Sequence, residues 1–463
     1  MESIIIIVFV IGYLAIAMEH PIKINKTASA LVTGVLCWTL FMIAEPSATL
    51  LQSQNFNQFL ENIKGHVDDF AALSSAEIHR EYVVESLGHH LNEIAQILFF
   101  LMGAMTIVEL VDAHQGFKLV TDRINTKSPV KLLWVICWVT FFLSAVLDNL
   151  TTTIVMVSLA RKLIHNRDMR LFFAGMIIVA ANAGGAWSPI GDVTTTMLWI
   201  GGQITAAGII KNTILPSVVC MLVPLIYLTF TLKGTLGGHP EKPHGAATPH
   251  HETHNITTGN LMLFLGIGAL ISVPIFKTVT HLPPYLGMML GLGLLWIVSE
   301  VLNPNLDEHV KKHYTAAHAL TRIDMPSVLF FLGILLAVGA LQSMGTLANF
   351  AGYLNTTIGD NRIIITLIGM LSAIVDNVPL VAASMGMYSL DTYPTDHMIW
   401  EYLAYCAGTG GSMLVIGSAA GVAAMGMEKI DFLWYVKKIS LLALMGYLAG
   451  AAVYLVQYSA THS

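Results

Sequence analysis

The apolar stretch 131–170 is interrupted at its centre by polar residues, and this break constrains how the chain can fold. Asp148 and Asn149, followed closely by three threonines, lie between two long apolar runs. Basic residues flank both ends of the stretch, and Lys and Arg gather in cytoplasmic loops, so both ends are expected on one side of a membrane. We therefore predict a re-entrant hairpin over 131–163 that turns at Asp148. A carboxylate at that depth indicates a functional site.

The composition places the chain among polytopic membrane proteins of the all-α class. Of its 463 residues, 55% are hydrophobic and only 11% are charged, and the mean hydropathy is +0.68. Soluble domains carry roughly 25% charged residues. The four cysteines have no CxxC spacing and predict neither a disulfide framework nor a metal cluster. The run at 3–18 lacks the basic start of a signal peptide and is predicted to be the first transmembrane helix.

Apolar windows of about 20 residues, the length that crosses a bilayer, recur along the chain. They lie at 3–18, 27–44, 93–112, 213–232, 259–276, 284–302, 326–345 and 439–458. Four further apolar segments are broken by polar residues or glycines: 131–163, 170–200, 361–390 and 399–427. With 131–163 and 361–390 as re-entrant hairpins and the other two as single crossings, most Lys and Arg residues lie on the cytoplasmic side. This topology places both termini outside.

Two polar stretches receive simpler interpretations. Segment 46–92 is expected to hold short amphipathic helices at the external membrane interface. Segment 233–258 contains five histidines among Gly, Pro and Thr, and it is expected to be a flexible cytoplasmic linker. Its histidines could bind metal adventitiously or titrate near neutral pH.

An internal repeat relates the broken segments to one another. SAVLDNLTTT at 144–153 returns as SAIVDNVPLV at 372–381, and ANAGGAWSPIG at 181–191 returns as GTGGSMLVIG at 408–417. Basic residues flank the first hairpin and acidic residues flank the second, so the two copies are expected in opposite orientations. Inverted repeats with interrupted helices in corresponding positions are typical of secondary transporters with a site near the bilayer midplane.

Polar groups at the breaks define the expected chemistry. Asp148, Asp192 and Asp376 lie at three breaks, whereas Lys and Arg occur in the broken segments only near their ends. These carboxylates would repel an anion, but a small hard cation favours carboxylate, amide and hydroxyl oxygens. We therefore predict a Na+ or Li+ site at the three aspartates. The other candidate ligands are Asn149, Thr152, Asn182, Ser188, Thr194, Thr195, Ser372, Asn377, Ser412 and Ser418. The residues expected to unwind the helices are Gly184, Gly185, Pro189, Gly191, Gly410, Gly411 and Gly417.

The same acids are expected to couple the ion to protons. Burial beside a second carboxylate favours the protonated form and a bound cation favours the ionised form, so the ion and the proton compete. As an alternative, each aspartate could serve only as the N-cap of the half-helix that follows it. Glu109 is a candidate proton relay, although it could simply reach the cytoplasmic interface.

Four segments carry a family resemblance: SAVLDNLTTTIVM, ANAGGAWSPIGDVTTT, VDNVPLV and GTGGSMLVIGSAAG. They resemble the NhaD-type sodium/proton antiporters of the ion transporter superfamily, and the resemblance covers essentially the whole membrane domain. It implies a homodimer held together by scaffold helices, with a transport domain of hairpins and broken helices that moves as an elevator. The dicarboxylate branch of the superfamily has Ser-Asn-Thr at both hairpin tips, which this chain lacks. By resemblance the functional positions are Asp148, Asn149, Asn182, Asp192, Thr194, Thr195, Ser372, Asp376, Asn377 and Ser412.

The resulting domain prediction has five parts. Residues 1–130 are N-terminal scaffold helices, 131–232 the first transport repeat, 233–258 the linker, 259–345 the second scaffold part and 361–463 the second transport repeat.

These features predict a bacterial inner-membrane antiporter that exports Na+ or Li+ in exchange for H+. The expected partners are the lipid bilayer and a second copy of the chain, with no cofactor and no nucleic acid. The alternative is a sodium-coupled divalent-anion symporter of the same fold, and a channel or a membrane scaffold is a further class. An enzyme is not expected, because no nucleophile stands near a base at a useful spacing.

Overall fold

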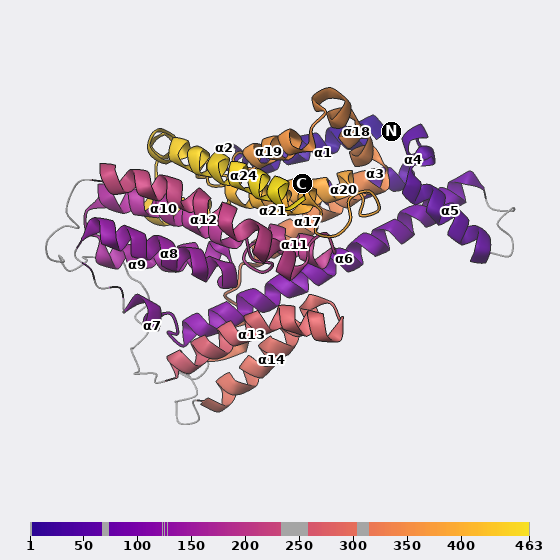
Figure 1. Cartoon of the computed structure of the whole chain (residues 1–463). Helices are drawn as coiled ribbons and strands as arrows, with labels where there is room; N and C mark the ends of the chain where they lie inside the picture. The colour runs from indigo at the N-terminus through magenta and orange to yellow at the C-terminus, as the bar shows by residue number, and fades with distance from the viewer. Residues whose placement is uncertain are drawn as a thin grey trace.

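The computed structural model describes residues 2–66, 74–232 except 123, 125 and 127, 258–302 and 314–462. Every regular element in these ranges is a helix, as Figure 1 shows, and eight of these helices are long and apolar enough to cross a membrane. The prediction of an all-α polytopic membrane protein is confirmed. The predicted linker 233–258 lies outside the described residues except for Thr258.

Helices α1 (Glu2–Ala17), α3 (Lys26–Ile43) and α17 (Met325–Ser343) pack together through close backbone contacts. Where α3 meets α17, a Cβ atom on Gly34 would lie 2.5 Å from the carbonyl oxygen of Gly333, so the contact requires glycine. Small residues of this kind let membrane helices approach closely. The indole Nε1 of Trp38 also donates to the carbonyl of Leu336, at 2.8 Å, across the same contact.

The long helix α6 (Ser75–Ala113) corrects the prediction for segment 46–92. Two short helices, α4 (Ala48–Gln52) and α5 (Gln54–His66), lie in that segment as expected, but residues 75–92 belong to the same helix as the apolar window that follows. A capping box at Ser74 and Glu77 begins α6. Polar residues in its first half are buried through hydrogen bonds, so this half packs against protein: the Tyr82 hydroxyl donates to the carbonyl of Ser343 at 2.7 Å.

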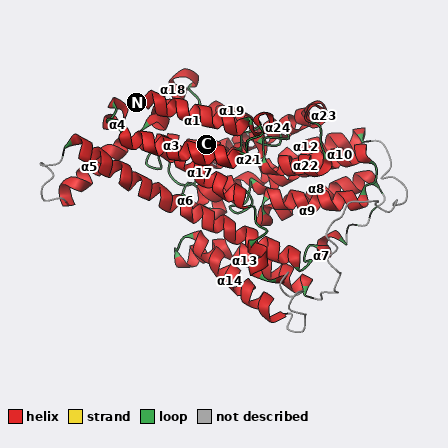
Figure 2. Ribbon diagram, turned by 180° about the vertical axis from the view of Figure 1, so that it is seen from behind, coloured by secondary structure: helices red, strands yellow, loops and turns green. Residues whose placement is uncertain are grey.

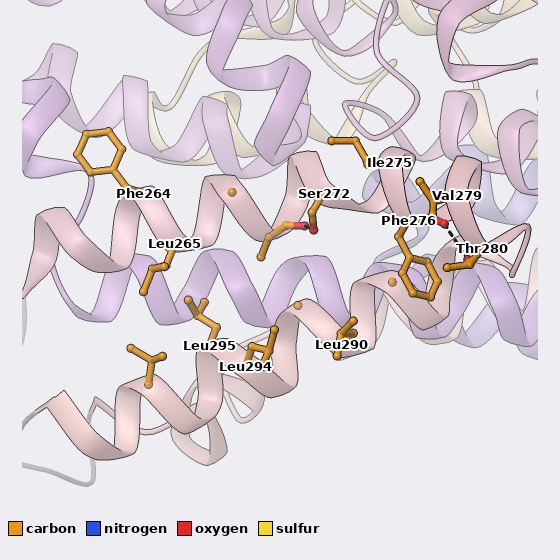
Figure 3. Close-up of a pocket in the computed structure, with 15 residues that line it drawn as sticks. Phe264, Leu265, Ser272, Ile275, Phe276, Val279, Thr280, Leu290, Leu294 and Leu295 are labelled. Atoms are coloured by element: carbon orange, nitrogen blue, oxygen red, sulfur yellow. Dashed lines mark hydrogen bonds between the residues drawn. The ribbon is translucent and has the colours of Figure 1, made fainter.

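Helices α13 (Gly259–Thr280) and α14 (Pro284–Leu302) form a hairpin that packs against α6 at the edge of the molecule (Figures 1 and 2). Between them lies an open groove of about 540 Å³ that is lined almost entirely by apolar side chains, including Phe264, Leu294 and Ile275 (Figure 3). An apolar surface of this kind suits contact with lipid.

Each of the four broken segments forms two consecutive helices. The first hairpin is α8 (Pro129–Leu147) and α9 (Asn149–Leu163), and the second is α19 (Asn361–Leu371) and α20 (Asn377–Met387). The first broken helix is α10 (Arg167–Gly185) and α11 (Val193–Ile200), and the second is α21 (Met398–Gly410) and α22 (Ala419–Glu428). By itself, α8 is long and apolar enough to span a membrane. Length and composition therefore do not distinguish one arm of a re-entrant hairpin from a transmembrane helix.

The remaining described helices connect or flank these segments. They are α2 (Glu19–Ile22), α7 (Lys118–Thr121), α12 (Ala206–Thr231), α16 (Ala316–Leu320), α18 (Thr346–Ile358), α23 (Phe432–Tyr435), the π-helical turn η3 (Val436–Ser440) and α24 (Leu441–His462). Helices α12 and α24 pack against each other and against α21. In both views α8, α9, α10 and α12 gather at one end of the molecule, and α4 and α5 lie at the other (Figures 1 and 2).

The two broken helices run antiparallel. Arg161, in the last turn of α9, and Arg170, near the start of α10, place their Nε atoms 2.7 Å from the carboxylate of Glu428, where α22 ends. At the opposite end, the Asp396 amide, just before α21, donates to the carbonyl of Gln203, just after α11, at 2.9 Å. An antiparallel course is the geometry expected for two copies in opposite orientations.

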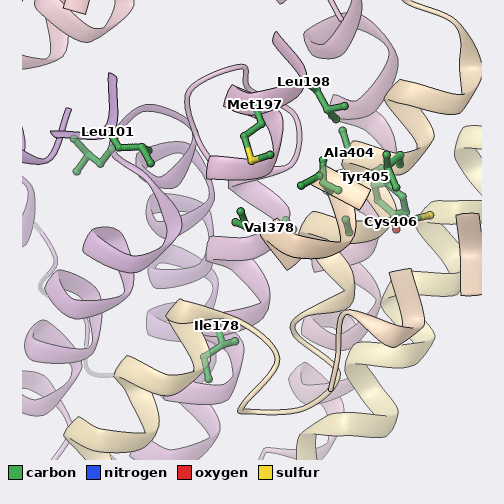
Figure 4. Close-up of a cluster of buried hydrophobic side chains, with 14 of the residues drawn as sticks. Leu101, Ile178, Met197, Leu198, Val378, Ala404, Tyr405 and Cys406 are labelled. Atoms are coloured by element: carbon green, nitrogen blue, oxygen red, sulfur yellow. The ribbon is translucent and has the colours of Figure 1, made fainter. Parts of the chain in front are cut away.

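Apolar side chains fill the space between the broken helices. Figure 4 shows Ile178 of α10, Met197 and Leu198 of α11 and Tyr405 of α21 among them, and these side chains are at most 2% exposed. These apolar side chains lie on the same half-helices that carry the polar groups at the breaks.

Candidate functional site

Four half-helices begin at the breaks, and each is capped by a side chain. Asp148 caps α9 by accepting from the Thr151 amide at 2.7 Å, and Asp192 caps α11 by accepting from the Thr194 amide at 2.8 Å. Asp376 and Ser418 cap α20 and α22 in the same manner. Helix N-termini carry partial positive charge and stabilise nearby anions, so the fold supports three aspartates in a largely apolar interior.

Asp192 lies at the centre of a polar network that joins both hairpins. Its side chain accepts from the Asn149 amide nitrogen at 2.6 Å and from the Asn377 amide nitrogen at 3.4 Å, so each hairpin contributes one amide. The Thr194 hydroxyl adds a further donor at 2.8 Å. Asp192 is 2% exposed, and no cationic side chain pairs with it in the part of the chain that the structure describes.

Asn182 extends this network to the second broken helix. Its Oδ1 accepts from the Asn149 amide at 3.1 Å, and its Nδ2 donates to the hydroxyls of Ser412 at 3.0 Å and Ser418 at 2.9 Å. Asn182 is fully buried. The network therefore contains side chains from all four broken segments, and the hydrogen-bonded pair Asn182 and Ser418 is 236 residues apart in the chain.

The other candidate hydroxyls lie near the network but bond elsewhere. The Thr195 hydroxyl donates to the Asp192 carbonyl at 2.9 Å, and the Ser188 hydroxyl accepts from the Ile190 amide at 3.4 Å. Ser372 donates to the carbonyl of Ala407, and Ser144, its counterpart in the first repeat, donates to Ala181. The Thr152 hydroxyl is buried without a hydrogen-bond partner among the described residues, so it is free to accept or donate.

The predicted helix-breaking glycines occupy equivalent crowded positions in the two copies. A Cβ atom on Gly184 would lie 3.0 Å from the Cα of Phe141, and one on Gly410 would lie 3.4 Å from the Cα of Gly369, with backbone oxygens closer still. Gly191 and Gly417 likewise press against Ala145 and Ala373, and Gly185 and Gly411 against Gly191 and Gly417. The first break also contains Pro189, whose carbonyl accepts from the Thr196 hydroxyl at 3.0 Å. Each hairpin therefore packs directly on the backbone of its broken helix.

The three predicted acidic ligands do not surround one point. Asp148 and Asp376 cap their own helices, although the charge of Asp192 lies within electrostatic range of both. Across the described ranges, no group of three or more His, Cys, Asp or Glu side chains is placed to hold a metal ion. The Na+ or Li+ site at all three aspartates stays a prediction. The N-caps named above as the alternative role of the aspartates do form in this structure. Among the three aspartates, only Asp192 accepts a hydrogen bond from an amide of each hairpin.

Sequence reasoning missed a cation at the second hairpin tip. Lys26, the first residue of α3, places its Nζ 2.9 Å from Oδ2 of Asp376. The available signal was its position directly before the apolar window 27–44, where a lysine can bury its methylene stem while its ammonium stays with polar partners.

A second missed residue is Glu401 in α21, which is completely buried. Its carboxylate accepts from the Asn212 amide at 2.8 Å and from the Tyr454 hydroxyl at 2.9 Å. Its signal was a lone carboxylate within an apolar segment.

Glu109, the candidate proton relay, makes no hydrogen bond to this network among the described residues. Its Oε2 lies 3.5 Å from Nε of Arg322, in the stretch before α17. A relay role stays a prediction, and the ion pair agrees with the alternative in which Glu109 reaches a polar boundary.

Helices that break at paired positions around a buried carboxylate define a polytopic membrane transporter. The sequence profile of the citrate transporter family matches residues 13–408. Sodium/proton antiporter 1 of Arabidopsis thaliana is 47% identical over 97% of this chain and 71% of its own length. Sodium/proton antiporter 2 of the same plant is 45% identical over 97% of this chain and 98% of its own. The Na(+)/H(+) antiporter NhaD of Vibrio cholerae is 27% identical over 97% and 90%. The chain belongs to the citrate transporter family, and its relatives place it among the NhaD-type antiporters of the ion transporter superfamily.

Proposed function

We propose that the protein is a secondary antiporter that exchanges Na+ or Li+ for H+ across a bacterial inner membrane. The observation that carries the proposal is Asp192, a buried carboxylate that accepts hydrogen bonds from one amide of each hairpin and has no cationic partner in the described residues. The names of relatives that match nearly the whole chain support it.

The side chains around Asp192 can serve both the empty and the loaded site. In this structure Asn149 and Asn377 donate N–H groups to the Asp192 carboxylate, and these bonds stabilise its negative charge. If the amide group rotates about its side-chain bond, it presents its oxygen to the site instead. Rotation of these amides would therefore supply neutral oxygen ligands to a small hard cation, beside the carboxylate and the hydroxyls of Ser412 and Ser418. Asp192 is the centre of the proposed site, and Asp148 and Asp376 act at its edge.

Competition for this carboxylate couples the two ions. Burying a bare carboxylate costs several kcal/mol, so only the protonated or the cation-loaded form should cross the membrane. Acid then suppresses cation binding, and alkaline conditions permit it. We further propose that the broken segments move as an elevator against scaffold helices in a homodimer, which the family resemblance supports. The distribution of Lys and Arg supports a topology with both termini outside.

The second candidate is a sodium-coupled divalent-anion symporter, which the description of the matched family as citrate transporters favours. The charges at the breaks oppose it. Three aspartates lie there and Lys26 is already paired with one of them, so an anion would meet net repulsion.

Proteoliposomes with a preset inside-acid gradient and a pH-sensitive dye test the proposal. Added Na+ or Li+ should collapse the gradient without any organic anion. Asp192→Asn should lower the rate by about tenfold or more, because losing a charged ligand costs above about 1.4 kcal/mol. Asp168→Asn, an exposed acid in the first turn of α10, is the matched control and should behave like wild type. If wild type responds to Na+ only when citrate or succinate is supplied, the symporter replaces the antiporter.

A further inference from the structure

The two hairpin tips are alike in sequence, but only the aspartate of the second tip is paired with a cationic side chain among the described residues. The Asp148 side chain accepts from the amide and the hydroxyl of Thr151, and within the described residues it has no ion pair. Asp376, its counterpart, has both oxygens engaged. Oδ1 accepts from the Val378 amide at 3.2 Å, and Oδ2 accepts from the Lys26 ammonium at 2.9 Å. A cation that binds Oδ2 of Asp376 would lie beside the Lys26 ammonium and be repelled by it, so the two cations compete for this oxygen.

Lys26 is held at this position by several groups. Its side chain is 27% exposed, and its ammonium lies 4.4 Å from the centre of the Phe330 ring on α17. Its backbone amide donates to Glu19 at 3.1 Å, and the charges of Glu19 and Asp324 act on it together with that of Asp376. Tyr13 of α1 lies near Asp376 as well. Three acids therefore lie within electrostatic range of the ammonium.

The ion pair also joins two parts of the molecule that are far apart in the chain. Lys26 belongs to α3, which packs against α1 and α17, and Asp376 lies at the tip of the second hairpin, 350 residues away. Asp376 is only 16% exposed, so the pair is partly shielded from water and from salt. It links the hairpin tip to α3.

We propose that Lys26 is the resident counter-ion of Asp376, a positioning residue that the transported cation must displace, and whose displacement frees the second hairpin from α3. This inference rests on the proposed function and adds a regulation to its site. Lys26 keeps its charge throughout; the ammonium and the cation compete for one carboxylate oxygen, and the release of the tip accompanies loading.

Sodium dependence of exchange is the first test. Lys26→Gln should lower the half-saturating Na+ concentration by about three- to tenfold, as expected when a partly exposed ion pair no longer competes. Lys26→Arg keeps the charge and should retain a half-saturating concentration within about twofold of wild type. Lys23→Gln removes a charge from the same loop, at an exposed side chain, and should have no effect. A higher half-saturating concentration in Lys26→Gln, or an equal change in Lys23→Gln, would overturn the inference.

A second measurement separates this inference from the proposed function. Purified full-length protein is treated with an amine-reactive reagent in NaCl or in choline chloride, and modification of Lys26 is followed by mass spectrometry. Na+ should speed modification in wild type, whereas Asp376→Asn should be modified rapidly in both salts. If Na+ does not change the rate in wild type, competition is wrong whether or not the protein transports. If Na+ speeds modification but wild type shows no proton exchange, the inference stands and the antiporter proposal falls.

Discussion

At the scale of single residues, substitution can separate the N-cap that Asp148 forms from the role in ion exchange that we propose for it. Asp148 adopts a backbone φ of 114°, an uncommon conformation for a residue other than glycine, and it caps α9 through Thr151. Asp148→Asn keeps a capping oxygen and removes the charge, whereas Asp148→Ala removes both and should lose about 1 kcal/mol of stability. We expect Asp148→Asn to melt like wild type in detergent and to lose exchange. If Asp148→Asn exchanges ions at the wild-type rate, Asp148 serves only as an N-cap.

The acidic residues at the breaks could be predicted from sequence, because carboxylates within apolar runs are costly and stand out. The partners of those acids could not be predicted. The contact between Lys26 and Asp376 depends on how far the second hairpin reaches along α3, and the preference of Asp192 over the other acids depends on where two hairpin amides meet. Both are distances between segments far apart in the chain, which no local pattern encodes.

At the scale of helices, the breaks depend on glycines that let each hairpin lie on the backbone of its broken helix. Gly184→Ala would drive a methyl group into the Phe141 backbone, and overpacking of this kind costs about 1–3 kcal/mol. We expect a lower melting temperature in detergent. Gly426→Ala, on an exposed face of α22 with open space around it, is the control and should be neutral or stabilising by up to about 1 kcal/mol. Equal melting of the two variants would contradict the packing described at Gly184.

The sequence predicted the positions of helices that consist of apolar runs with polar or glycine breaks. It did not predict a helix whose buried side chains are polar. The two hairpins and the two broken helices lie within a few residues of their predicted bounds. The first half of α6 was missed because His79 and Tyr82 look like surface residues in sequence, yet both are buried through hydrogen bonds to backbone carbonyls of Phe41 and Ser343. Their partners lie on other helices.

At the scale of the whole molecule, the proposed topology sets the two ends of the broken helices on opposite sides of the membrane. His165, between α9 and α10, should face the cytoplasm, and Asp391, between α20 and α21, should face outward; both are exposed. Single cysteines at these positions should react with an impermeant maleimide from opposite sides of oriented vesicles. The four natural cysteines are all buried and should give little background. Labelling of both positions from one side would refute the inverted arrangement.

The network around Asn182 and Asp192 also bears on how the chain assembles. Asn182 donates to two serines of the second half, and Asp192 accepts from Asn377 of that half. Each half alone would leave buried polar groups unpaired in an apolar environment, where an unmet hydrogen bond costs several kcal/mol. A gene divided between Leu232 and Thr258 should therefore yield two polypeptides that are degraded when made singly and that restore one another when made in the same cell.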